Sequence, residues 1–561
     1  MRKRLVLALV AFLTVVAAVP PARAQVPAPK VTITGLFDQV TSAGRNFYDA
    51  NYARDNDREW YARTRFRPDF EFAVGRTKAV LGIELDLMYG QGGSNDGGFP
   101  GNNSGQVCGF VQGCKFGTGG GLDLNTDVAG LFEIKWIYTE FDLTGKDSLL
   151  PFIPVLTVAR AGGQPFATLA NYKVAYANGD FAGLSTITTF TPEIKLAFAY
   201  VIVEDQLAGG NRLPAGTLNT QSRTNRGEDY AFILSPELTP LKGLDMKPLF
   251  SWFHADGTTA GAARRNANNR RTVGQAMNGA GAFAGTPLVG AGTGTTTSGD
   301  ATMHEERYTV GIDARWRVGA FGLDPTLYYQ WGHYETQAFR TNGTIGRVEG
   351  EASAWLFDVI ASYQLGPLLL EVRGIYSPGN KARDNLSLSK RYFEPLDLDA
   401  GYYNGWAAIL GSGVDYFNGG GGPNTGMATN VGYDRFGRGQ LGVRATYNIT
   451  PALAVYGIVS PTWTAEKVDT DTNIVPAPQA NFTARQTVDD QSWVKGDSSY
   501  IGTEMDLGLT WRFAPNTAFD LQGAYLKAGH ALDTAELLNG VHTRRTANDA
   551  YLLAARVRLA F

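Results

Sequence analysis

The chain has 561 residues, of which 44% are hydrophobic and 18% are charged, and its formal net charge at pH 7 is −3. This mildly acidic balance argues against a nucleic-acid partner, because nucleic acids select basic surfaces. The sequence contains 68 Gly, 25 Tyr, 30 Phe and 10 Trp, a composition that suits alternating strands joined by polar loops.

The N-terminus has the three parts of a secretory signal peptide. Residues 2–4 are basic, residues 5–19 form an apolar run, and Ala22-Arg23-Ala24 is a small-x-small cleavage site. The run is shorter than the ~20 apolar residues that a spanning helix needs. We expect residues 1–24 to be removed, residues 25–30 to be a short N-terminal segment, and residues 31–561 to form one domain.

Alternation of apolar and polar residues between turn signals predicts about eighteen strands. The two weakest segments are 150–160 and 181–191, so sixteen strands is the other count that the pattern allows. The predicted strands cover 31–41, 59–74, 77–90, 127–143, 150–160, 181–191, 194–204, 228–237, 245–254, 305–318, 321–334, 350–365, 367–377, 437–449, 452–464, 500–513, 518–528 and 548–561.

The connections between these strands alternate strictly between short and long. Short turns fall at positions such as Gly75-Arg76, Gly319-Ala320 and Pro515-Asn516, whereas long polar connections cover residues 91–126, 255–303, 378–436 and 465–499. Transmembrane β-barrels have short periplasmic turns and long extracellular loops. The pattern therefore predicts an all-β fold, a transmembrane antiparallel barrel wide enough to enclose an aqueous channel.

A β-sandwich or a β-propeller would also show alternating strands, so alternation alone does not decide the fold. A propeller would repeat at a fixed period. The connections here range from two residues to nearly sixty, and no blade motif recurs. Both features favour the barrel.

Charged residues on one face of the early strands are candidates for lining the lumen. Arg63, Arg65 and Arg67 alternate along one strand, and a two-residue turn at Gly75-Arg76 would place Arg67 opposite Glu84 and Arg65 opposite Asp86. Opposite charges across a strand pair stabilise a sheet by a few tenths to ~1 kcal/mol. The arginines are thus either a selectivity element or local ion-pair partners. Further candidates on predicted lumen faces are Glu133, Lys135, Arg315 and Arg317.

Two glycine-rich stretches could fold inward and narrow the lumen, or could form an extracellular lid. One is 91–126, in which Cys108 and Cys114 frame the segment CGFVQGC, and the other is 161–180. A disulfide between the two cysteines is expected, because an oxidising compartment favours pairing across so short a loop.

No residue pattern predicts enzymatic chemistry. The five histidines, at positions 254, 304, 333, 530 and 542, are scattered through the sequence without zinc-protease spacing, and there is no nucleophile elbow or phosphate-binding loop. His304 with Glu305 and Glu306 is interpreted as exposed charge on a loop. We expect no catalytic residue, no bound metal and no cofactor.

The last thirteen residues alternate between an apolar and a polar face and end on an aromatic residue. Arg556 and Arg558 lie on the polar face, and the apolar face carries Tyr551, Leu553, Val557, Leu559 and Phe561. This ending resembles the C-terminal sorting signal of Gram-negative outer-membrane β-barrels, which the barrel-insertion machinery reads.

The resemblance implies a general porin-like protein of the cell outer membrane. Such a protein reaches that membrane after secretion through the periplasm. Its expected partners are outer-membrane lipid, the insertion machinery and small hydrophilic solutes or ions that diffuse passively through a water-filled channel. Such porins are usually homotrimers, although the sequence shows no interface. Strand character begins at Val31, which leaves no room for an N-terminal plug. The alternative is a non-conducting barrel that serves as a structural anchor or adhesin through its long loops.

Overall fold

The structure is a computed structural model. It describes residues 28–46, 53, 58–89, 132–166, 172–173, 175–177, 180–205, 228–256, 302–339, 345–382, 384, 388–396, 405–411, 436–468, 470, 496–538 and 541–561. Within these ranges, no helix is both long enough and apolar enough to cross a membrane.

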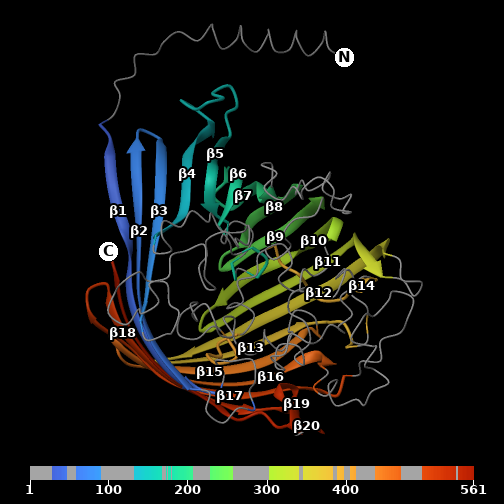
Figure 1. Ribbon diagram of the computed structural model, residues 1–561. Coiled ribbons are helices and arrows are strands. Elements are labelled where there is room, and N and C mark those ends of the chain that lie inside the picture. Colours follow the sequence, from blue (N-terminus) through green and yellow to red (C-terminus); the bar gives the residue numbers. More distant parts are fainter. Residues whose placement is uncertain are drawn as a thin grey trace.

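Eighteen strands of the described chain form a closed antiparallel barrel (Figure 1). The prediction of eighteen strands is confirmed, including the two weakest. The barrel strands are β1 (Lys30–Arg45), β2 (Arg58–Val74), β3 (Thr77–Tyr89), β4 (Phe132–Thr144), β5 (Leu156–Pro165), β6 (Asp180–Thr191), β7 (Ile194–Asp205), β8 (Glu228–Leu241), β9 (Leu244–Asp256), β10 (Thr302–Val318), β11 (Phe321–Phe339), β12 (Ile345–Leu365), β13 (Leu368–Ser377), β15 (Arg438–Thr450), β16 (Leu453–Val468), β17 (Ser498–Ala514), β18 (Thr517–Ala528) and β21 (Ala550–Ala560).

Three short strands lie outside this ring. β14 (Ser389–Lys390) pairs in parallel with β12, so it adds to the sheet without entering the barrel order. β19 (Thr534–Leu538) and β20 (Val541–Arg545) pair with each other in a separate hairpin between β18 and β21.

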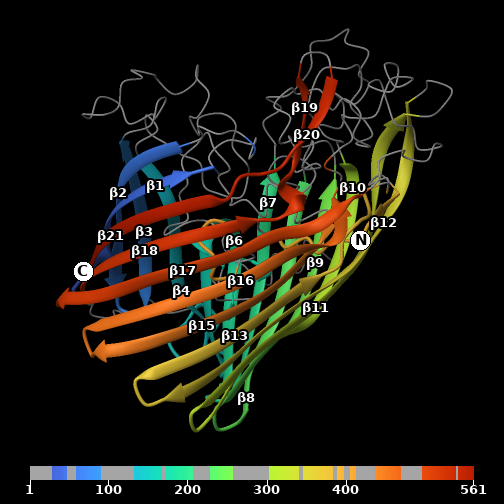
Figure 2. The same cartoon turned by 90° about the horizontal axis from the view of Figure 1, so that it is seen from below.

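The barrel closes where the last strand meets the first. β21 pairs with β18 on one side and with β1 on the other, in a register that sets Leu36 opposite Ala560. The Phe561 N–H donates to the Gly35 carbonyl at 3.1 Å, and the Gly35 N–H donates back at 2.9 Å. Figure 2 shows β1, β18 and β21 side by side near the C-terminus. Both ends of the barrel chain therefore lie at the same rim, as an even strand count requires.

The short turns lie at that same rim. Gly75, in the turn between β2 and β3, has φ of +61°, a left-handed conformation that a glycine adopts without steric cost. Asn516, between β17 and β18, has φ of +55° and is one of the few residue types that tolerate this region. The tight turns fix the register of each hairpin.

The two faces of the strands differ as the alternation predicts. On β17, Leu507 is 74% exposed on the outside, whereas its neighbour Asp506 is 1% exposed on the inside. On β21, Leu553 and Phe561 are exposed on the outside. An outward apolar surface and an inward polar one are what a transmembrane barrel requires.

Several strand boundaries differ from the prediction by up to six residues, and one strand is shifted as a whole. The strand expected at 150–160 runs over Leu156–Pro165, because residues 145–155 form a compact turn. In that turn the Leu149 N–H donates to the Asp142 carbonyl at 3.2 Å and the Gly145 N–H to the Ile153 carbonyl at 2.9 Å. These internal hydrogen bonds satisfy backbone groups that a longer hairpin would have paired.

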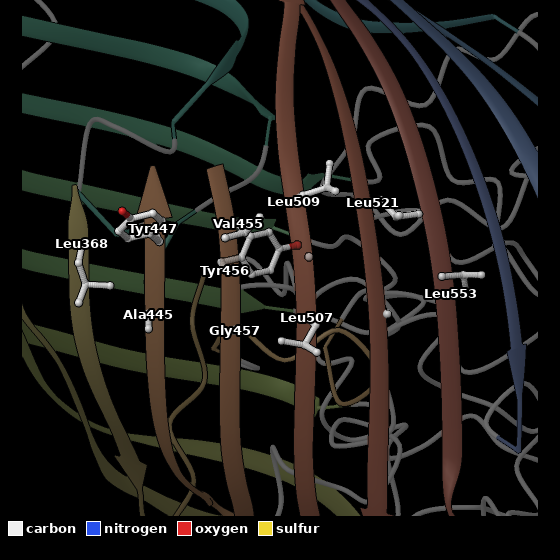
Figure 3. A pocket seen from close by; sticks show the side chains of 12 residues that line it. Leu368, Ala445, Tyr447, Val455, Tyr456, Gly457, Leu507, Leu509, Leu521 and Leu553 are labelled. Atoms are coloured by element: carbon white, nitrogen blue, oxygen red, sulfur yellow. The ribbon is translucent and has the colours of Figure 1, made fainter. Parts of the chain in front are cut away.

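The outer face carries an apolar depression of about 580 Å³ around Leu507 (Figure 3). Gly457 on β16 and Gly523 on β18 lie directly opposite Leu507 in the two strand pairs. Because neither glycine has a side chain, the surface is lower on both sides of the leucine. The depression faces away from the lumen.

Replacing Leu507 by Arg should lower the free energy of unfolding by about 2–4 kcal/mol in a phospholipid bilayer, because the cation would face hydrocarbon near the middle of β17. Denaturant titration in vesicles measures the change. Leu507→Met, which keeps an apolar side chain, is the control. An arginine variant as stable as this control would contradict the conclusion that the Leu507 side chain faces the lipid.

Candidate functional site

The arginine row on β2 faces the lumen and is paired with acids. Arg65 lies 2.9 Å from Glu84, and the Arg67 Nε lies 2.8 Å from the other Glu84 oxygen. The register places Arg65 opposite Asp86 as predicted, but the Asp86 side chain lies outside the described residues. Glu84 therefore neutralises part of the row.

Arg63, at the other end of the row, belongs to a buried cluster at the barrel seam. Its guanidinium lies 3.7 Å from Asp38 on β1, and both side chains are at most 1% exposed. Arg556 on β21 also binds Asp38, with two hydrogen bonds of 2.7 and 2.6 Å. Arg63 thus stabilises the closure of the barrel, whereas Arg67 keeps a side-chain exposure of 33%.

A β-bulge changes which β4 residues face the lumen. Gly82 on β3 pairs with Trp136, but the next residue, Ile83, pairs with Ile134, so Lys135 is the extra residue. Simple alternation from Glu133 would turn Trp136 and Tyr138 toward the lipid, and the bulge turns them toward the lumen instead. The Arg67 guanidinium lies 5.9 Å from the Trp136 ring centre, which places that ring on the lumen side.

Glu133 lies on the other side of this bulge, opposite Glu84 in the register. Its backbone position therefore matches the predicted lumen face, and its side chain lies outside the described residues. Lys135, as the bulged residue, does not follow the alternation from which it was predicted.

A network of charges continues along the wall to β5. Glu140 on β4 lies 3.0 Å from Lys78 and 2.6 Å from Arg160, and Arg160 lies over the Tyr138 ring at 5.2 Å. The Lys78 and Arg160 side chains are 30% and 34% exposed. Alternation does not indicate Tyr138 as a lumen residue, because the bulge reverses the β4 faces.

Arg315 and Arg317 both lie on the inner face of β10. Arg315 donates to the Tyr172 carbonyl at 3.1 Å and lies over the Tyr172 ring at 4.5 Å. Arg317 forms a bidentate pair with Asp324 on β11. Each predicted cation is thus bound to a specific partner.

The segment after β5 folds into the lumen and binds the wall formed by β10, β11 and β12. The Asp313 carboxylate on β10 accepts hydrogen bonds from the Tyr172 N–H at 2.7 Å and the Lys173 N–H at 2.8 Å. The Lys173 ammonium donates to the backbone carbonyls of Asp324 and Asp358. Of the two stretches proposed as constrictions, 161–180 is the one whose described residues reach the lumen wall. The other, 91–126 with Cys108 and Cys114, lies outside the described residues.

Burial changes the acid–base properties of this inward segment. It lowers the pKa of Lys173, an effect that Asp358 and Asp313 partly offset by stabilising the ammonium. The Tyr172 hydroxyl has a raised pKa, mainly through burial and then through Glu237 and Asp245. Tyr172 therefore stays neutral, and its ring is available to both Arg315 and Lys247.

A second inward segment, residues 405–411, is held by the same kind of contact. The two oxygens of Glu504 on β17 accept hydrogen bonds from the Ile409 and Leu410 N–H groups at 2.7 and 2.8 Å. Asp506 accepts a hydrogen bond from the Ala408 N–H at 3.3 Å. Sequence alternation placed both acids in the lumen, but it did not indicate that a segment 94 residues away would cover them.

A third segment, residues 388–396, packs against the first. Glu394 lies 2.9 Å from Arg307 on β10, and Arg307 also binds Glu305 at 2.7 Å. The Leu396 N–H donates to the Tyr176 carbonyl at 2.8 Å, which joins this segment to the first. Glu305, predicted as loop charge, is a buried strand residue.

Removing one anchoring carboxylate should release only its own segment. In Asp313→Ala, the Tyr172 and Lys173 amides lose their acceptor, so deuterium exchange of peptides covering 172–177 should accelerate. In Glu504→Ala, the accelerated peptide should be the one covering 405–411. Each variant is the control for the other, and equal acceleration at both segments would indicate general destabilisation instead.

No protein-family model and no curated protein sequence matches the chain. Solved structures with similar overall form include Pseudomonas aeruginosa OccK8 (OprE), with 12% identity, a TM-score of 0.43, and coverage of 95% of this chain and 98% of that one. A BenF-like porin from Pseudomonas fluorescens Pf-5 has 9% identity and a TM-score of 0.42, covering 95% and 98%. Pseudomonas aeruginosa OpdK with vanillate has 11% identity and a TM-score of 0.39, covering 94% and 98%.

Proposed function

We propose that the protein is an outer-membrane porin, a water-filled channel for passive diffusion of ions and small hydrophilic solutes. The observation that supports this most directly is a set of charged side chains that stay partly exposed inside a closed barrel, among them Arg67, Lys78 and Arg160. Barrels of about 16 to 18 strands are too wide for their own side chains to fill.

The position of these side chains leaves a route along one wall. Among the described residues, the inward segments form hydrogen bonds with strands β9 to β17 and share an apolar cluster with β7 and β8. Arg67, Lys78 and Arg160 lie outside this region, on β2, β3 and β5. In an eighteen-strand ring, β3 is nine strands from β12 and therefore lies on the opposite side. A solute would pass between the inward segments and this charged, aromatic-lined wall.

The proposal includes location and partners. The short-turn rim would face the periplasm and the long connections the exterior of a Gram-negative outer membrane. The apolar face of β21, from Tyr551 to Phe561, would serve the insertion machinery as a sorting signal. A homotrimer is included as the usual assembly of porins.

One observation favours the alternative, a closed barrel that acts as an anchor or adhesin. The first and third inward segments contribute Phe166, Tyr176 and Phe393 to a buried apolar cluster against the wall. This cluster occupies part of the lumen with side chains that exclude water. The alternative requires that the remaining space be too narrow for ions.

Conductance distinguishes the two functions. Purified protein in a planar bilayer should give stepwise, ohmic openings. A folded barrel that gives none, with folding checked by its altered mobility in unheated SDS gels, would contradict the porin function and favour the anchor.

The two ends of the arginine row should differ in their effect on ion selectivity. In Arg67→Ala, loss of a partly exposed cation should shift the reversal potential in a salt gradient toward cation preference. Arg63→Ala is the matched control, because Arg63 is 1% exposed and should alter stability instead. If neither variant, nor the combined Arg63, Arg65 and Arg67 alanine variant, moves the reversal potential, the row is structural.

A further inference from the structure

Three of the five histidines lie together on the outer face of the barrel, far from one another in sequence. Glu306 on β10 is directly opposite His254 on β9 and directly opposite His333 on β11. His304 lies two residues before Glu306 on the same face of β10. The histidine rings form a continuous series, with centroids 5.5 Å apart for His254 and His304 and 5.8 Å apart for His304 and His333.

The carboxylate at the centre of this cluster is held by specific contacts. The His254 Nδ1 lies 2.6 Å from Glu306 Oε1, and the His304 Nε2 lies 3.9 Å from the same oxygen. The Trp252 indole N–H donates to the other oxygen, Oε2. The His254 ring stacks on Tyr230, with centroids 4.8 Å apart. Hydrogen bonds and stacking of this kind orient ligand side chains in metal sites.

The cluster is separate from the lumen. Arg307 and Glu305, which alternate with Glu306 and His304 along β10, are buried on the inner face. The outer-face neighbours Tyr308 and Trp331 stack on each other, as expected of aromatic residues at a membrane–water boundary. The histidines lie between these rings and the rim at which β9 ends and β10 begins.

We propose that His254, His304 and Glu306 form a binding site for a transition-metal ion of the Zn²⁺ class at the outer rim of the barrel. Imidazole and carboxylate donors suit zinc, copper and nickel. Two His and one Glu, with a fourth position open to water, is an established zinc ligand set. The site is additional to the proposed channel and does not depend on it.

The distances require two small movements. Bonds of about 2.0–2.1 Å at tetrahedral angles place neighbouring donor atoms about 3.3 Å apart and two bound imidazole centres about 5 Å apart. The His254–Glu306 donor distance of 2.6 Å is shorter than 3.3 Å, and the His304–Glu306 distance of 3.9 Å is longer. The His254 and His304 ring centroids, 5.5 Å apart, are near the 5 Å expected of two bound imidazoles. As they stand, no three His, Cys, Asp or Glu side chains of the described chain are set to hold a metal ion. A turn of the His304 ring toward Glu306, together with a lengthening of the His254–Glu306 separation by less than 1 Å, would complete the set.

The test is a titration of the mature, untagged protein in detergent with ZnCl₂, in which calorimetry measures Zn²⁺ binding. We expect one high-affinity Zn²⁺ per chain, removable by EDTA and weakened at acidic pH, where the imidazoles are protonated. His304→Ala and His254→Ala should each abolish this binding. Trp252→Phe, which leaves Glu306 without its indole donor, should weaken it by roughly 10- to 100-fold.

His530→Ala is the matched control, because His530 lies away from the cluster and pairs with Asp533. It should bind Zn²⁺ as the unaltered protein does. Each variant is first shown to be folded by its mobility in unheated SDS gels. Absence of high-affinity binding in the unaltered protein, or equal binding by folded His304→Ala, would overturn the proposal.

Discussion

The pairing of the last strand with the first is the constraint on which the whole molecule depends. In hydrocarbon, an unpaired backbone N–H or C=O has no water to bind, so an open sheet edge is not viable there. β21 meets this condition by pairing with both β18 and β1. The buried Asp38, bound by Arg556 and close to Arg63, adds a charged contact across the seam. Closure then fixes the strand parity and sets both termini of the barrel at the short-turn rim.

Closure also creates an interior that is wider than its side chains can fill, and the chain fills part of it with its own connections. Asp313 and Glu504 illustrate how. Each carboxylate on the inner wall accepts hydrogen bonds from two successive backbone N–H groups of an inward segment. Backbone amides away from regular structure need acceptors, and buried carboxylates need donors. One contact satisfies both requirements, and it positions each segment against the wall.

Much of the barrel could be predicted from the alternation of side chains along each strand. The positions that depart from this alternation could not. Arg65 and Asp86 were placed correctly by counting from the turn at Gly75, because a two-residue hairpin leaves no freedom of register. The same counting fails for Trp136, because a single bulged residue at Lys135 reverses the β4 side chains that follow it. A bulge adds one residue without a composition signal, so alternation alone does not reveal it. His254, His304 and His333 looked scattered for a related reason, since only cross-strand register makes them neighbours.

The sequence by itself limited the strand count to sixteen or eighteen. It determined the outer and inner faces of most strands, the alternation of short and long connections, and the apolar terminal strand. These are local properties, which depend on residue type and on a spacing of two. Only the tertiary structure decided which acids hold which inward segments, which arginines stay exposed, and which histidines meet. Those depend on contacts between residues up to 518 positions apart, such as Asp38 and Arg556, and no local pattern encodes the register that brings them together.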